Sequence, residues 1–110
     1  METVVAKTTV VVQRPDAEAQ TVTIQIGTPR QTGTDPEEWA CPVSLKPLYS
    51  NLRDANGGSA FQALCLAASL VLDLLHGVVE KGGTVSFVGG DRFPFEAYGF
   101  GIAAGKHTPG

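Results

Sequence analysis

Four side chains in this sequence have the chemistry of zinc ligands: Cys41, Cys65, His76 and His107. Structural zinc sites draw on close pairs such as C-x₂₋₄-C or H-x₃₋₅-H, and none of these residues are spaced in that way. Cys65 and His76 fall on one predicted helix, where their spacing corresponds to about 16 Å along the axis. We therefore expect two buried thiols that behave as small hydrophobic side chains, and no metal or other cofactor.

Residues 101–108, with the sequence GIAAGKHT, partly resemble a phosphate-binding loop. Such a loop has four residues between its glycines and a serine or threonine directly after its lysine. Here Gly101 and Gly105 enclose three residues, and His107 follows Lys106. The spacing therefore excludes the motif.

Asp73, His76 and Glu80 lie at positions i, i+3 and i+7 of the predicted helix, where an acid–base pair could be oriented. General acid–base catalysis needs positioned partners in a cleft, and the sequence places no nucleophile nearby. We interpret the three residues as the solvated strip of the helix, with an i,i+4 contact between His76 and Glu80. The pattern contains no catalytic set, and we expect a protein that is not an enzyme.

The helix that carries these residues spans residues 59–81 and is unusually apolar. Its apolar side chains fill an arc of about 220° at 100° per residue, whereas an ordinary surface helix has a stripe of about 100°. The polar remainder is a narrow strip of Gln62, Ser69, Asp73, His76 and Glu80. One sheet cannot cover so broad an apolar surface, so we expect a partner surface, most simply a second copy of the chain.

Local signals mark both ends of this helix. Ser59 and Gln62 form the S-x-x-Q pattern of a capping box, in which the serine hydroxyl accepts from the Gln62 amide and the glutamine reaches back to the cap. Gly82 and Gly83 end the helix after Lys81. The helix is therefore the best-defined element of the sequence.

The remaining elements are predicted strands. Period-two alternation of Val and Thr predicts an antiparallel hairpin of residues 3–14 and 21–26. Residues 27–38 are rich in Gly and Pro and read as a loop. A third strand over residues 39–46 would direct Trp39, Cys41, Val43 and Leu45 inward, with Pro42 at an edge or a bulge. A polar connector over residues 51–58 precedes the helix, and residues 84–88 form a fourth strand.

These elements predict an α+β fold, with a three- to four-stranded, mainly antiparallel sheet and one long helix packed on one face. The length of 110 residues suits a single domain over residues 1–110. Residues 89–110 form its Gly- and aromatic-rich C-terminal segment, which we expect to pack against the core or against a neighbouring chain.

Composition limits the partners. The net charge is −3 and the basic residues are scattered, which disfavours a nucleic-acid surface. The amino terminus lacks the pattern of a secretory signal. Asp73 within the apolar stretch would cost about 2.5–3.5 kcal/mol at the centre of a bilayer, so we expect no membrane span. Two cysteines without the density of a secreted scaffold indicate a cytoplasmic protein.

Short motifs resemble a family of small bacterial proteins of uncharacterised role. That family has a W-x-C-P strand followed by G-x-D-S-x-Q-A-L-x-L-A at the start of a helix. Trp39-Ala40-Cys41-Pro42 matches the first motif, and the segment from Ser59 to Ala67 resembles the second, although the aspartate is missing from Gly57-Gly58-Ser59. The resemblance implies a compact α+β domain in a bacterial cytoplasm and carries no catalytic residues.

We therefore predict a non-enzymatic interaction module that binds a second copy of itself or another bacterial protein. The candidate interface residues are Ala60, Ala63, Ala67, Leu70 and Leu74. The alternative is a small-molecule-binding domain with a pocket between the helix, the sheet and the aromatic tail. The candidate pocket residues are Trp39, Phe93, Phe95, Tyr98 and Phe100.

Overall fold

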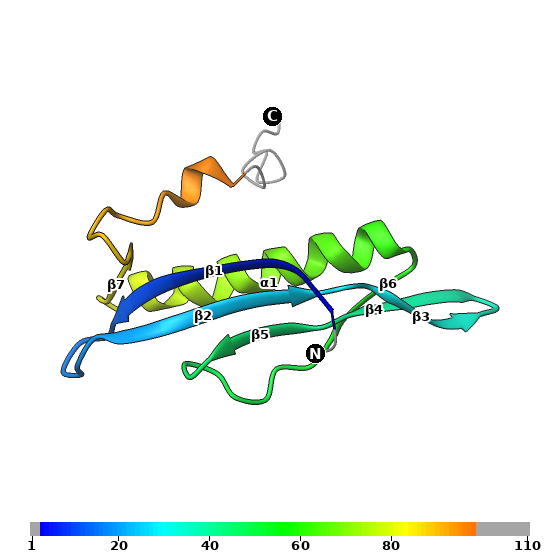
Figure 1. Cartoon of the computed structure of the whole chain (residues 1–110), viewed down its shortest axis with the longest axis horizontal. Coiled ribbons are helices and arrows are strands. Elements are labelled where there is room, and N and C mark those ends of the chain that lie inside the picture. Colours follow the sequence, from blue (N-terminus) through cyan, green and yellow to red (C-terminus); the bar gives the residue numbers. More distant parts are fainter. Residues whose placement is uncertain (1–2, 99–110) are drawn as a thin grey trace.

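The computed structural model describes residues 3–98 and contains two antiparallel sheets and one long helix (Figure 1). The larger sheet has the strand order β5-β2-β1-β7. Its strands are β1 (Val4–Gln13), β2 (Gln20–Gly27), β5 (Val43–Lys46) and β7 (Thr84–Phe87). The predicted α+β class is confirmed, and β1 and β2 form the predicted hairpin.

The smaller sheet was not predicted and has the strand order β3-β4-β6. Its strands are β3 (Arg30–Thr34), β4 (Glu37–Cys41) and β6 (Ala55–Gly57). The prediction of a loop over residues 27–38 is therefore wrong, and so is that of an irregular connector over residues 51–58. Both β3 and β6 lack the apolar alternation that identifies a strand, because neither has a fully buried face.

The predicted single strand over residues 39–46 is in fact two strands, β4 and β5, which belong to different sheets. The break falls at Pro42, which has no backbone N–H to donate to a ladder. Its carbonyl accepts a hydrogen bond from the Gly27 amide at 2.9 Å, at the end of β2. Cys41, Val43 and Leu45 are buried as expected, whereas Trp39 is half-buried.

The long helix α1 (Ala60–Glu80) has the predicted ends. The Ser59 hydroxyl accepts from the Gln62 amide at 3.1 Å. The Gln62 side chain accepts from the Gly58 amide, one residue before the expected partner. At the other end, the Gly83 amide donates to the Val78 carbonyl at 2.9 Å. The caps satisfy backbone groups that a helix terminus leaves unpaired.

Both sheets pack against the same side of α1, which contacts β4 and β6 of the smaller sheet and β2, β5 and β7 of the larger one. The core lies in this layer. Strand residues on the helix-facing side of the larger sheet include Val10, Val22, Ile24 and Leu45, and all four are buried. The other side of that sheet is polar, as alternating strands with one covered face require.

Candidate functional site

The five candidate interface residues predicted from the sequence lie toward the sheets. Ala63 and Ala67 are fully buried, and Ala60, Leu70 and Leu74 are half-buried. Because Ala63 and Ala67 already pack within one chain, a partner cannot reach them without displacing a sheet. A partner surface on α1 therefore cannot include Ala63 and Ala67, whereas Ala60, Leu70 and Leu74 each keep part of their surface exposed.

Apolar side chains also follow a second line along α1, on the flank away from the sheets. They are Phe61, Cys65, Ala68, Leu72 and Val79. We call this set the outer seam. Phe61 is 77% exposed and Val79 is 39% exposed, while the other three are half-buried. Within the described residues, the outer seam is the apolar surface that the fold leaves on this flank of α1.

The spacing of the outer seam was a signal available in the sequence. Its first four members are separated by four, three and four residues, which is the repeat of helices that pack along one another. In the sequence, this repeat cannot be distinguished from the sheet-facing line of α1, because the residues that face the sheets have similar types and similar spacing. Only the packing distinguishes the two lines.

Half of β1 is also uncovered. Strand β7 pairs with β1 only from Val10 to Gln13, so residues 4–9 have a β2 neighbour on one side and an open edge on the other. Ala6 and Thr8 share the helix-facing side with Val10, as their partners Ile26 and Ile24 show, yet both are exposed. Helix α1 therefore does not cover this end of the strand.

Trp39 lies apart from the other described pocket candidates, Phe93, Phe95 and Tyr98, whose rings contact one another. Trp39 pairs with Gly57, which lies against the first turn of α1. The Trp39 indole N–H donates to the Glu37 carboxylate at 2.6 Å. Phe95 instead contacts His76, about 20 Å further along the helix axis. Phe100 lies outside the described residues.

The described part of the aromatic tail packs on the carboxyl-terminal end of α1. Phe93 is buried in the core, and the Tyr98 ring stacks on it with centroids 4.8 Å apart. Phe95, in the short helix η1 (Phe95–Ala97), meets the His76 ring edge-on at 5.3 Å. The expectation that this segment packs against the core is confirmed for Phe93 and Phe95.

The residues considered for catalysis or metal binding are dispersed. His76 and Glu80 make the predicted contact at 3.5 Å, and Asp73 is exposed. The Cys41 thiol is buried, donates to the Gly27 carbonyl at 3.3 Å, and is not disulfide-bonded. Burial, together with the nearby Asp54 carboxylate, raises the pKa of Cys41. A buried thiol of this kind is a poor nucleophile.

No group of three His, Cys, Asp or Glu side chains gathers within residues 3–98 in a way that could hold a metal ion. His107 and the glycines of residues 101–108 lie outside that range. Among the described elements, α1 is long and apolar enough to cross a membrane by length and composition. A helix that packs one side on its own sheets and offers the other to a partner has the same composition.

Comparison with protein-family models, with curated proteins and with solved structures gives no match to this chain. The resemblance to the family with the W-x-C-P strand therefore stays a prediction. The function must be argued from the surfaces of the molecule itself.

Proposed function

We propose that this protein is a non-enzymatic interaction module that forms a homodimer through the outer seam of α1. The observation that carries the proposal is the high exposure of Phe61 at the head of a regularly spaced apolar line. A phenylalanine buries a large apolar area on contact, so leaving it in water forgoes a substantial free energy. A second chain would remove this line from water.

The seam suits a copy of itself. It contains no charged residue, so two seams can meet without burying an unpaired charge. Cys65 and Ala68 are small and lie in its amino-terminal half, which lets two helix axes approach closely there. A two-fold axis perpendicular to α1 would pack the two α1 helices antiparallel, with the same patch contributed by each chain.

The size of the patch predicts a modest affinity. Helix α1 is about 31 Å long and about 10 Å wide, which gives a footprint of roughly 300 Å² on each chain. Stable interfaces bury about 800 Å² on each partner. The uncovered residues 4–9 of β1 would need to extend the contact, and we expect a dissociation constant in the micromolar range.

Sedimentation equilibrium over a range of protein concentrations tests the proposal, with Phe61→Ser as the test variant and Leu66→Ser as the matched control. Leu66 is also exposed, at 43%, but lies on the opposite flank of α1. Both variants should fold, because neither side chain is buried. We expect Phe61→Ser to weaken the dimer at least about tenfold, as truncation of an aromatic anchor does, and Leu66→Ser to leave it unchanged.

A wild-type chain that stays monomeric at all concentrations would reject the homodimer. In that case a different protein captured by the seam, and lost with Phe61→Ser, would indicate a heterologous interaction module. Equal effects of the two serine variants would show that the seam has no special role. Cys65 gives an independent readout, because dimerisation should slow its alkylation and Phe61→Ser should restore it.

A further inference from the structure

A cavity lies on the side of the larger sheet that faces away from α1. It has a volume of about 870 Å³, within the usual range for small-molecule sites. Its floor is the polar side of β2 and β5, which presents Gln25, Ser44 and Lys46. Its wall is the segment that follows β5. We call this cavity the rear groove.

The wall and rim supply apolar surface as well as charge. Tyr49 and Leu52 come from the segment after β5, and Pro29 and Pro42 come from the two crossings between the sheets. Arg30 and Asp54 also line the groove and form an ion pair at 2.9 Å. The groove can therefore contact an apolar body and a charged group at the same time.

The charge of the lining is opposite to that of the whole chain. Arg30 and Asp54 offset one another, and Lys46 leaves one positive charge in a protein whose net charge is −3. The four strands of the larger sheet contain no aspartate or glutamate, and their lysines are Lys7 and Lys46. Lys7 is paired with Gln25 and Lys46 with Thr23 across the strands. Both partners face the rear side of the sheet, so both lysines lie on that side.

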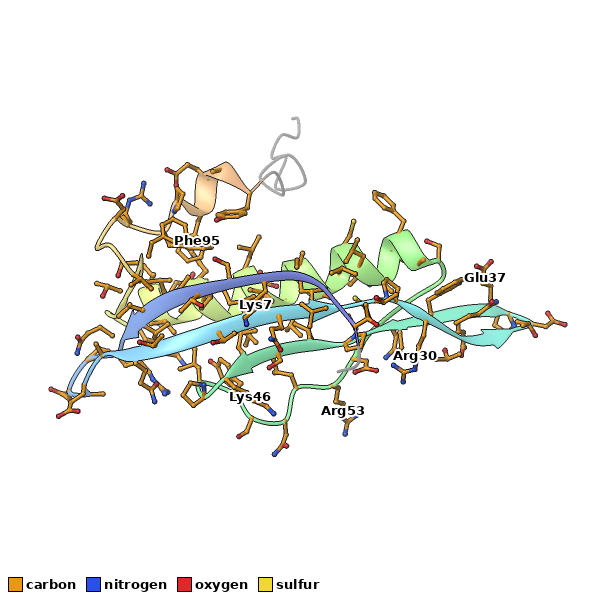
Figure 2. The ribbon with its side chains drawn as sticks, in the orientation of Figure 1. Lys7, Arg30, Glu37, Lys46, Arg53 and Phe95 are labelled. Carbon is orange, nitrogen blue, oxygen red and sulfur yellow. The ribbon has the colours of Figure 1, made fainter. Side chains whose placement is uncertain are left out.

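Figure 2 shows Arg30, Arg53 and Lys46 along the lower margin of the view, around the segment that follows β5. Phe95 lies at the opposite margin, beyond α1. Within residues 3–98, Lys46 has no ion-pair partner, and Arg30 uses only its Nη1 atom in hydrogen bonds. Ammonium and guanidinium donors are thus free to bind an anion at the groove.

We propose that the rear groove binds a small organic anion, with a carboxylate or phosphate held by Lys46, Arg30 adding positive charge to the lining, and an apolar body against Tyr49 and Leu52. The donors match the charge of such a ligand, and the mixed lining matches its two parts. The site is on the other side of the sheet from the outer seam. Binding at this site does not depend on dimerisation, so the monomeric Phe61→Ser variant should bind the anion as well as the wild type does.

Protein-observed ¹⁵N NMR at low ionic strength tests this site with phenylphosphate as the probe. A probe of this size is expected to bind with a dissociation constant of about 1 mM. The expected result is saturable shifts at the amides of Ser44, Lys46 and Ser50, with much weaker shifts from benzyl alcohol, which has the ring without the charge. Equal responses to the two compounds, or shifts confined to α1, would overturn the proposal.

Charge variants sharpen the test. Lys46→Gln should weaken phenylphosphate binding about tenfold, because it removes a charge-assisted donor, whereas Lys81→Gln, beyond the end of α1, should not change it. Asp54→Asn should strengthen binding, since it removes a repelling carboxylate and releases Arg30. A purely structural role for the ion pair predicts weaker binding instead, so a loss of affinity in Asp54→Asn would contradict the assignment.

Discussion

The two sides of α1 have similar residue types but different surroundings. Toward the sheets, Ala63, Ala67 and Leu75 are fully buried. On the outer flank, Phe61 is 77% exposed although its apolar side chain is larger than any of these three. Hydrophobicity alone therefore does not decide which residues of this helix enter the core.

The difference follows from the position of the sheets. A sheet layer covers a stripe of about 100° on a helix, and the apolar arc of α1 is about twice that width. The sheets cover one part of the arc and leave the outer seam. If this comparison is correct, substitutions on the two sides must have different effects on stability.

The largest expected difference is between Leu75→Ala and Leu66→Ala. Leu75 has no exposed surface, so truncation should leave a cavity and cost about 3 kcal/mol in the free energy of unfolding. Leu66 is partly exposed, and its truncation should cost less than about 1 kcal/mol. Urea denaturation monitored by circular dichroism measures both. Similar costs would mean that the sheets do not define the buried side.

Substitution of two glycines by alanine tests the packing by adding a methyl group rather than by removing side-chain atoms. A Cβ at Gly83 would lie 2.6 Å from the Gln13 carbonyl oxygen and 2.7 Å from the buried Val78 side chain. We expect Gly83→Ala to cost about 1–3 kcal/mol through this overpacking. A Cβ at Gly77 would meet nothing within 4 Å.

Gly77→Ala is therefore the matched control for Gly83→Ala. It should raise the free energy of unfolding by up to about 1 kcal/mol, because alanine is the better helix former. Thermal unfolding of the two variants shows directly whether each substitution raises or lowers the free energy of unfolding. A destabilised Gly77→Ala would show that this flank of α1 is more closely packed than the structure indicates.

The amino-terminal cap should have a smaller effect that does not depend on the side of the helix. Ser59→Ala removes the acceptor of the Gln62 amide and should cost about 1 kcal/mol. Ser59→Asp keeps an acceptor and should retain most of that stability. Chemical denaturation of both variants tests the cap, and equal losses would mean that the serine acts through something other than this hydrogen bond.

The smallest expected effect concerns the tail over the end of α1. The Arg92 guanidinium holds the pKa of Glu96 below its ordinary value through a hydrogen bond and an ion pair at 2.8 Å. The stabilisation is present above the unfolded pKa of Glu96 and is lost as the pH falls through the lowered folded value.

Both side chains are exposed, so salt should screen this contact and its contribution should be small. The protection factors of the amides around η1, which correct the exchange rates for the intrinsic effect of pH, should fall on acidification, and less so in the Glu96→Gln variant. The same pH dependence of exchange in the wild type and in Glu96→Gln would show that Glu96 does not contribute to the packing of the tail on α1.

Elements defined by local chemistry could be predicted from the sequence. The capping pair Ser59 and Gln62 and the glycines after Lys81 fixed α1, and alternation in β1 and β2 fixed the hairpin. The smaller sheet could not be predicted. Strands β3 and β6 have no buried face of their own, and they form because β4 pairs with both.

The candidate sites show the same division. The outer seam has a visible spacing, yet its exposure depends on where the sheets lie. The rear groove has no local signature at all: Arg30, Lys46 and Asp54 are far apart in the chain. They line one groove because Pro42 sends β4 and β5 into different sheets and the segment after β5 leads back to β6 of the smaller sheet.

The sequence by itself thus determined the helix, its ends, the hairpin and the excess of apolar surface, since each depends on residues within a few positions of one another. Only the tertiary structure decided which part of that surface is covered, that there are two sheets, and which side chains line the rear groove. Those features depend on contacts between distant segments, and the free energy of such contacts is not encoded in any one of them.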